Sequence, residues 1–90
     1  MNQLEQARRE INQIDAQMAA LFERRMQAAE QVAAYKKRQG LPIFDKAREQ
    51  AVLENNLARL QNQAYRPYYQ AFLQHLMELS KEYQAAVLNG

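Results

Sequence analysis

The stretch QLEQARREINQIDAQMAALFERRMQAAEQVAAYKKRQ, residues 3–39, decides the fold of this chain. It contains neither Gly nor Pro, and most of it is Ala, Gln, Glu, Arg and Met, which favour helices. Its apolar side chains recur at heptad spacing in two neighbouring rows: Leu4, Ile11, Met18, Arg25, Val32 and Ala7, Ile14, Leu21, Ala28, Tyr35. This periodicity predicts one long helix with a continuous apolar seam.

Arg25 interrupts the seam, since the pattern calls for an aliphatic side chain at its position. A guanidinium on a buried face is costly unless an anionic group meets it. Taken alone, Arg25 is more simply a residue that sets helix register or bonds a protein partner than a ligand contact.

The length of this helix predicts an oligomer. About 37 residues with a rise of 1.5 Å span roughly 55 Å, whereas a 90-residue globule is only roughly 30 Å across. The rest of the chain can cover only part of the seam. We therefore expect a second copy to cover the remainder, most simply in a symmetric, antiparallel homodimer.

The composition excludes several kinds of chemistry. The chain has no Cys and a single His, so thiolate or histidine metal sites and Ser-His catalysis have almost no ligands or bases, and we expect no metal and no cofactor. Apolar runs are too short for a membrane span, and a secretory leader is not visible, which favours the cytoplasm. The net charge of +2 does not indicate nucleic acid, because acidic residues accompany the basic ones along every helix.

Two shorter helices are expected after the long one. Gly40 and Pro42 end the first helix, and Asp45 caps a second helix over about 45–61. Pro67 suits the first turn of a third helix over about 66–88. The sequence thus predicts an all-α chain forming a single domain over residues 1–90.

Polar residues fall on apolar faces of all three predicted helices: Arg25, Lys36, Glu49, Ser80 and Gln84. Each has an ordinary explanation on its own, such as a solvated helix end for Lys36 or an early-helix charge for Glu49. Together they supply cations, one carboxylate and neutral hydrogen-bonding groups to a common interior. That combination suits a polyanionic ligand that carries a hydroxyl.

Arg8 is a further cation on the first helix, but it lies ~25 Å from Arg25 along the helix axis. The two side chains of one chain cannot grip one small molecule. Two antiparallel copies paired about a dyad near Ala16 and Gln17 would bring Arg8 of one chain opposite Arg25 of the other.

In this order and spacing, the residues resemble the all-helical (AroQ-class) chorismate mutases over essentially the whole chain. The first helix carries Arg8, Ile11, Ile14, Asp15, Leu21, Arg25, Met26, Val32, Tyr35 and Lys36 of that pattern, and the later parts carry Asp45, Arg48, Glu49, Ser80 and Gln84. The ordered set is specific, although each piece alone is weak.

The resemblance implies an intertwined homodimer that rearranges chorismate to prephenate in phenylalanine and tyrosine biosynthesis. Arg25 and Arg8 of the other chain would bind the two substrate carboxylates. Lys36 and Gln84 would donate to the ether oxygen, and Glu49 would accept from the ring hydroxyl. Asp45, through its backbone, would help Glu49, and Arg48 and Ser80 would complete the pocket.

Two alternatives stay open at this point. Isochorismate-pyruvate lyases use a similar charged pocket on the same fold, and relatives also handle amino-substituted chorismates. From another class, the chain could be a non-enzymatic helical dimerisation module in which the misplaced polar residues are incidental. The sequence also leaves open a fused or partner enzyme of the shikimate pathway.

Overall fold

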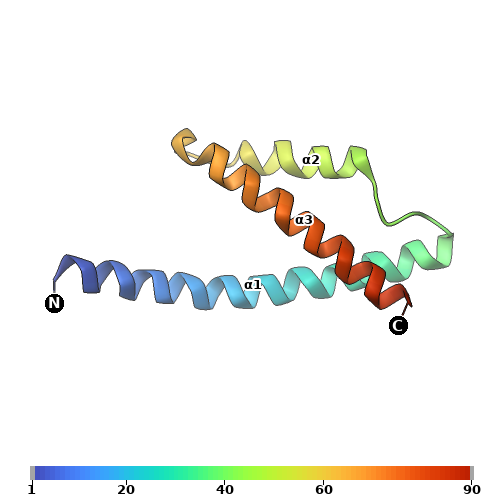
Figure 1. The fold of residues 1–90 in the computed structure, drawn as a ribbon, viewed down its shortest axis with the longest axis horizontal. Coiled ribbons are helices and arrows are strands. Elements are labelled where there is room, and N and C mark those ends of the chain that lie inside the picture. The colour runs from blue at the N-terminus through green and yellow to red at the C-terminus, as the bar shows by residue number, and fades with distance from the viewer. Residues whose placement is uncertain (1, 90) are drawn as a thin grey trace.

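The computed structural model describes residues 2–89 and contains three α-helices: α1 (Gln3–Gln39), α2 (Lys46–Leu57) and α3 (Arg66–Asn89). A short 3-10 helix, η1 (Gln63–Tyr65), leads into α3. Helix α3 runs diagonally between α1 and α2 and packs against both of them (Figure 1). The all-α prediction with one very long helix is confirmed.

Local hydrogen bonds and backbone geometry define where α1 begins and ends. The Asn2 side chain accepts a hydrogen bond from the Glu5 backbone N–H at 2.8 Å, which satisfies one of the free donors of the first turn. Gly40 has φ 66°, in the left-handed region that a residue without Cβ adopts most easily. The Leu41 N–H then donates to the Lys36 carbonyl at 2.8 Å, closing the last turn.

Helix α2 begins as the sequence indicates but ends earlier. Asp45 caps it from outside the helix, since Oδ1 accepts from the Arg48 N–H at 3.1 Å. The helix stops at Leu57 rather than near Gln61, so the expected range of 45–61 was too long. The chain closes there in tight turns, with the Leu60 N–H donating to the Leu57 carbonyl at 3.2 Å. Leu57, the last residue of α2, is only 3% exposed and belongs to the core.

The core lies where α3 crosses the C-terminal half of α1 and reaches α2. The buried apolar residues among those described are Ala29, Ala33, Leu57, Leu73 and Met77. Ala29 and Ala33 are small enough to let α3 approach the α1 backbone closely, and Ala33 is 0% exposed. This core is small for a 90-residue chain, because a compact domain of that size ordinarily buries more side chains.

The N-terminal half of α1 extends past the rest of the molecule (Figure 1). Every residue from Asn2 to Arg24 is exposed. The radius of gyration is 16.3 Å, against about 12 Å for a compact domain of this length. The exposed side chains include the predicted seam residues Leu4, Ile11, Ile14, Met18 and Leu21, together with Phe22.

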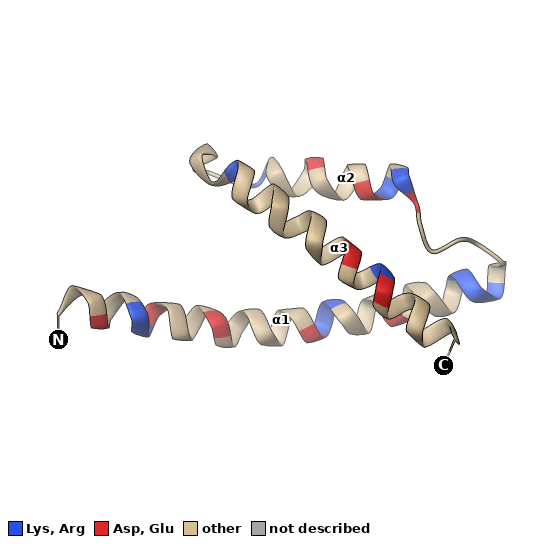
Figure 2. Ribbon diagram, viewed as in Figure 1, with Lys and Arg blue, Asp and Glu red and all other residues tan. Residues whose placement is uncertain are grey.

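Charged residues of both signs are spread along α1 (Figure 2). By contrast, residues 67–77 of α3 contain no Asp, Glu, Lys or Arg. Within residues 2–89, no helix combines the length and the apolar character that a bilayer crossing requires.

Candidate active site

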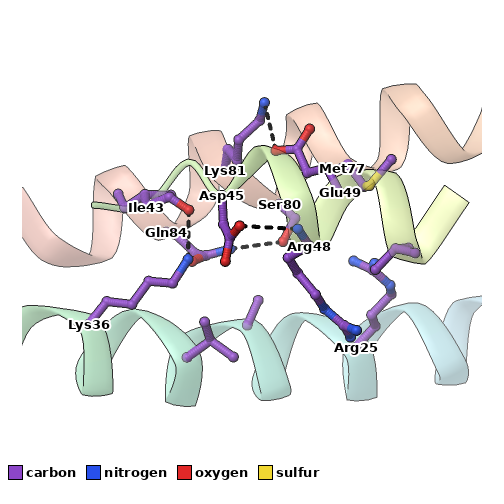
Figure 3. Close-up of a pocket in the computed structure, with 13 residues that line it drawn as sticks. Arg25, Lys36, Ile43, Asp45, Arg48, Glu49, Met77, Ser80, Lys81 and Gln84 are labelled. Carbon is purple, nitrogen blue, oxygen red and sulfur yellow. Dashed lines mark hydrogen bonds and ion pairs between the residues drawn. The ribbon is translucent and has the colours of Figure 1, made fainter. Parts of the chain in front are cut away.

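A pocket of about 270 Å³ lies between α1, the 40–45 connection, α2 and α3. Its size is near the lower end of the range for small-molecule sites, about 300–1,000 Å³. Its wall has an apolar part made by Ala29, Val32, Ile43, Val52 and Met77. Its polar part is made by Arg25, Lys36, Asp45, Arg48, Glu49, Ser80, Lys81 and Gln84 (Figure 3).

Helix α1 supplies Arg25 and Lys36, eleven residues or about three turns apart on one side of the helix. Both side chains are half-buried and line the pocket at its two ends (Figure 3). The Lys36 ammonium donates to the Ile43 carbonyl at 2.7 Å. This hydrogen bond links the cation to the connection that follows α1 and fixes its position.

The start of α2 supplies Asp45, Arg48 and Glu49. Asp45 and Arg48 are exposed at the pocket rim, where the Asp45 carboxylate is already used as the helix cap. Glu49 is half-buried and forms an ion pair with Lys81 of α3, with Lys81 Nζ and Glu49 Oε2 3.0 Å apart. Lys81 therefore connects the carboxylate on α2 to α3.

Ser80 and Gln84 lie one turn apart on α3 and are the buried polar residues of the described chain, 7% and 8% exposed. The Gln84 amide donates to the Ser80 hydroxyl at 3.2 Å. Among residues 2–89, Gln84 Oε1 has no hydrogen-bond partner. A buried amide oxygen without a partner is costly, so a ligand in the pocket can satisfy this amide. Rotating the amide by 180° would instead let Ser80 donate to Oε1 and free Nε2 to donate into the pocket.

The pocket wall has an excess of positive charge. Arg25, Lys36, Arg48 and Lys81 are cationic, whereas Asp45 and Glu49 are the carboxylates of the wall. The excess of two positive charges would balance a ligand with two carboxylates.

Arg8 is the one predicted site residue that this pocket does not include. It lies on the exposed N-terminal half of α1, ~25 Å along the helix from Arg25. The structure of one chain thus brings the other predicted residues together and leaves Arg8 apart, as the helix geometry required.

Sequence reasoning missed two polar groups of the pocket, Lys81 and the Ile43 carbonyl. Lys81 precedes Gln84 by three residues, a spacing that puts both side chains on neighbouring positions of one helix face. That spacing could have identified Lys81. The Ile43 carbonyl gives no sequence signal, because every residue type offers the same backbone acceptor.

A second, apolar cavity lies beside this pocket, between α1 and the uncharged part of α3. We call it the α1–α3 groove; its apolar lining includes Met18, Leu21, Phe22, Phe72, Leu76 and Leu79. Its volume is about 770 Å³. Arg25 lines both the groove and the polar pocket, so the two cavities meet at this side chain.

A hydrogen bond outside the pocket joins α3 to α1. The Tyr83 hydroxyl donates to the Glu30 carboxylate. This hydrogen bond, together with desolvation and the negative charge of Glu30, raises the pKa of Tyr83 above its usual value of 10.0. The contact supports the crossing of the two helices next to Gln84.

Comparison with known protein families identifies the chain. The model of the family described as chorismate mutase type II matches residues 7–85, so the chain belongs to that family. The resemblance drawn from the residue pattern is confirmed, and the chain is an enzyme of the isomerase class rather than a non-enzymatic dimerisation module. Comparisons with curated proteins and with solved structures found no match.

Proposed function

We propose that this protein converts chorismate to prephenate by an intramolecular Claisen rearrangement, in the biosynthesis of phenylalanine and tyrosine. This pericyclic reaction moves six electrons within one molecule and needs no nucleophile, general base or metal. It needs the substrate held in a folded reactive conformer. It also needs hydrogen-bond donors at the ether oxygen, which gains negative charge as its bond to carbon lengthens.

The observation that carries the proposal is the gathering of Arg25, Lys36, Glu49 and Gln84 around one pocket from three helices. The substrate is a dicarboxylate with a ring hydroxyl, and the pocket has two excess positive charges and a half-buried carboxylate. Arg25 is assigned to a carboxylate of the substrate, because its planar guanidinium can form paired hydrogen bonds with one. The unpartnered Oε1 of the buried Gln84 amide supports a polar ligand at this place.

Lys36 and Gln84 are assigned to the ether oxygen. Lys36 is held before substrate arrives by the Ile43 carbonyl. Gln84 is held by burial beside Ser80, where the rotated amide would direct Nε2 into the pocket. Donors already held in place stabilise developing charge without reorganising at the moment of reaction. Glu49 would accept from the ring hydroxyl, helped by the backbone of Asp45, while Arg48 and Ser80 would complete the contacts with the substrate.

The proposed active form is a homodimer with shared sites. The exposed seam of α1 and the α1–α3 groove together form an apolar surface that one chain leaves uncovered. An antiparallel second copy, with its dyad near Ala16 and Gln17, would cover this surface. It would also bring its own Arg8 toward Arg25, at the side chain where groove and pocket meet. Arg8 of the second chain would then bind the other substrate carboxylate.

The test is loss of chorismate absorbance on addition of the purified protein, with prephenate identified by its conversion to phenylpyruvate in acid. Arg25→Ala and Lys36→Ala serve as variants, each checked by circular dichroism for intact helices. We expect the wild type to consume chorismate rapidly and to form prephenate. Both variants should show almost no activity. A folded wild-type dimer that converts no chorismate would overturn the proposal, and isochorismate would then be tested as the lyase substrate.

A further inference from the structure

Lys81 of α3 lines the candidate site and is held there by two contacts. Its ammonium is 3.0 Å from Glu49 Oε2. On another side it lies 4.8 Å from the centroid of the Phe44 ring, within the ~6 Å range of cation–π attraction. The side chains of Lys81 and Glu49 are 32% and 27% exposed, so the pair is partly shielded from water. The Lys81 ammonium from α3 thus lies between the carboxylate of α2 and an aromatic ring of the 40–45 connection.

This ion pair changes what Glu49 can recognise. A carboxylate accepts hydrogen bonds at both oxygens, and Lys81 is ion-paired with Oε2, which leaves Oε1 for a donor on a ligand. The charge of Glu49 is already balanced by Lys81. A neutral donor such as a hydroxyl therefore meets an acceptor whose own charge is balanced. A cationic donor such as an ammonium gains the attraction of Glu49 but is repelled by Lys81 at a similar distance.

We infer that Lys81 is a specificity-determining residue that makes this end of the pocket select a ring hydroxyl over a ring ammonium. The inference rests on the proposed function, because it takes Glu49 as the group that faces the ring hydroxyl of chorismate. Lys81 acts through Glu49 and does not touch the reacting atoms, so it is a positioning residue. The remaining cations of the wall, Arg25, Lys36 and Arg48, add to the repulsion of a cationic substituent.

The experiment compares chorismate with the analogue that has an amino group in place of the ring hydroxyl, 4-amino-4-deoxychorismate. For each protein, kcat/KM is measured on both compounds, and the inhibition constant of the analogue against chorismate turnover is measured as a second readout. The variants are Lys81→Met, which removes the charge and keeps the length, and Lys81→Arg, which keeps the charge. The matched control is Lys46→Met, since Lys46 is an exposed lysine outside the pocket wall.

In Lys81→Met, the preference for chorismate over the amino analogue should fall by about tenfold, the effect expected for one nearby unit charge in a partly screened site. The inhibition constant of the analogue should fall in the same variant. Lys81→Arg should keep the wild-type preference, and Lys46→Met should leave it unchanged. A merely structural role would instead lower the rates on both compounds together and keep their ratio.

An unchanged preference and an unchanged inhibition constant in a folded Lys81→Met protein would overturn the inference, while chorismate turnover by the same protein would leave the proposed function intact. If Lys81→Met does not fold, Lys81→Gln replaces it under the same criteria. A wild-type protein that does not convert chorismate contradicts the proposed function and, with it, this inference.

Discussion

The two halves of α1 have the same repeating apolar pattern, yet they have different surroundings. In the C-terminal half, Ala29 and Ala33, which lie outside the two rows of the predicted seam, are buried under α3, whereas Val32 and Tyr35 of those rows are exposed. Arg25 and Lys36 line the polar pocket. In the N-terminal half, Leu4, Ile11 and Ile14 are exposed, as are all the residues around them on the helix. One helix thus contributes a packed wall at one end and an uncovered apolar surface at the other.

The difference teaches that heptad spacing identifies an apolar helix, but neither which of its faces a neighbour covers nor what covers it. Helix α3 covers α1 where Ala side chains permit close approach of the two backbones. The larger side chains farther along α1, such as Met18, Leu21 and Phe22, remain beside a groove of about 770 Å³. Large apolar side chains that lie together uncovered mark interaction surfaces in soluble proteins.

The largest effect is expected in the packed half, from Lys36→Ala. Removing one donor that is already in place costs ~3–4 kcal/mol of barrier, or a loss of about 10²–10³ in kcat. Steady-state turnover of chorismate measures it. Ser80→Ala, which leaves the charges of the wall intact, should lose far less, and comparable losses in the two variants would contradict the assigned roles.

The next test joins the two halves of α1. Arg8→Ala and Arg25→Ala should each be nearly inactive, because each removes one carboxylate-binding group from both sites of the proposed dimer. Mixed and refolded together, the two variants form heterodimers with one intact site of two, so about a quarter of wild-type activity should return. Mixtures no more active than the separate variants would show that Arg8 and Arg25 of different chains do not share a site.

Ile14→Glu addresses the exposed half alone. A carboxylate near the proposed dyad would be buried twice in the dimer, so the variant should dissociate to monomers and lose activity with them. Sedimentation or light scattering across a concentration series measures the dissociation. Asn12→Glu places the same charge on nearly the opposite face of α1 and is expected to stay dimeric; equal behaviour of the two variants would contradict this interface.

Gln84→Glu tests the donor at the buried end of the pocket through pH. An ionised carboxylate would repel the ether oxygen, whereas a protonated one could donate to it. Activity of the variant should therefore rise as the pH falls toward the usual pKa of a glutamic acid, about 4.3, with burial moving the rise to higher pH. The ratio of variant to wild-type kcat between pH 4.5 and 8 reports this, and a constant ratio would exclude the contact.

The smallest effect is expected from Tyr83→Phe, which removes the hydrogen bond to Glu30 between α3 and α1. Because folding raises the pKa of Tyr83, its contribution to stability is present in full below pH 10.0 and is lost as the pH rises through the higher folded-state value. The variant should melt at a slightly lower temperature than the wild type at neutral pH, and the difference should shrink in alkali. Thermal melts at pH 7 and above pH 10 compare the two, and an equal difference at both would contradict the role of this hydrogen bond.

The sequence by itself determined the features that depend on local interactions. Its unbroken helix formers, with Gly40 and Asp45 at the boundaries, indicated the end of α1 and the start of α2. The set of polar residues on apolar faces pointed to the family that residues 7–85 match. These signals are readable because caps and helix periodicity act within a few residues.

Only the tertiary structure decided the rest. The early end of α2 at Leu57 follows from the turn back toward α3, and no Gly or Pro between residues 58 and 62 announces it. The ion pair of Lys81 with Glu49 and the hydrogen bond of Lys36 to the Ile43 carbonyl join groups from different segments. Such contacts depend on how the helices cross, and the crossing is set by long-range packing around Ala29 and Ala33 rather than by neighbours in the chain.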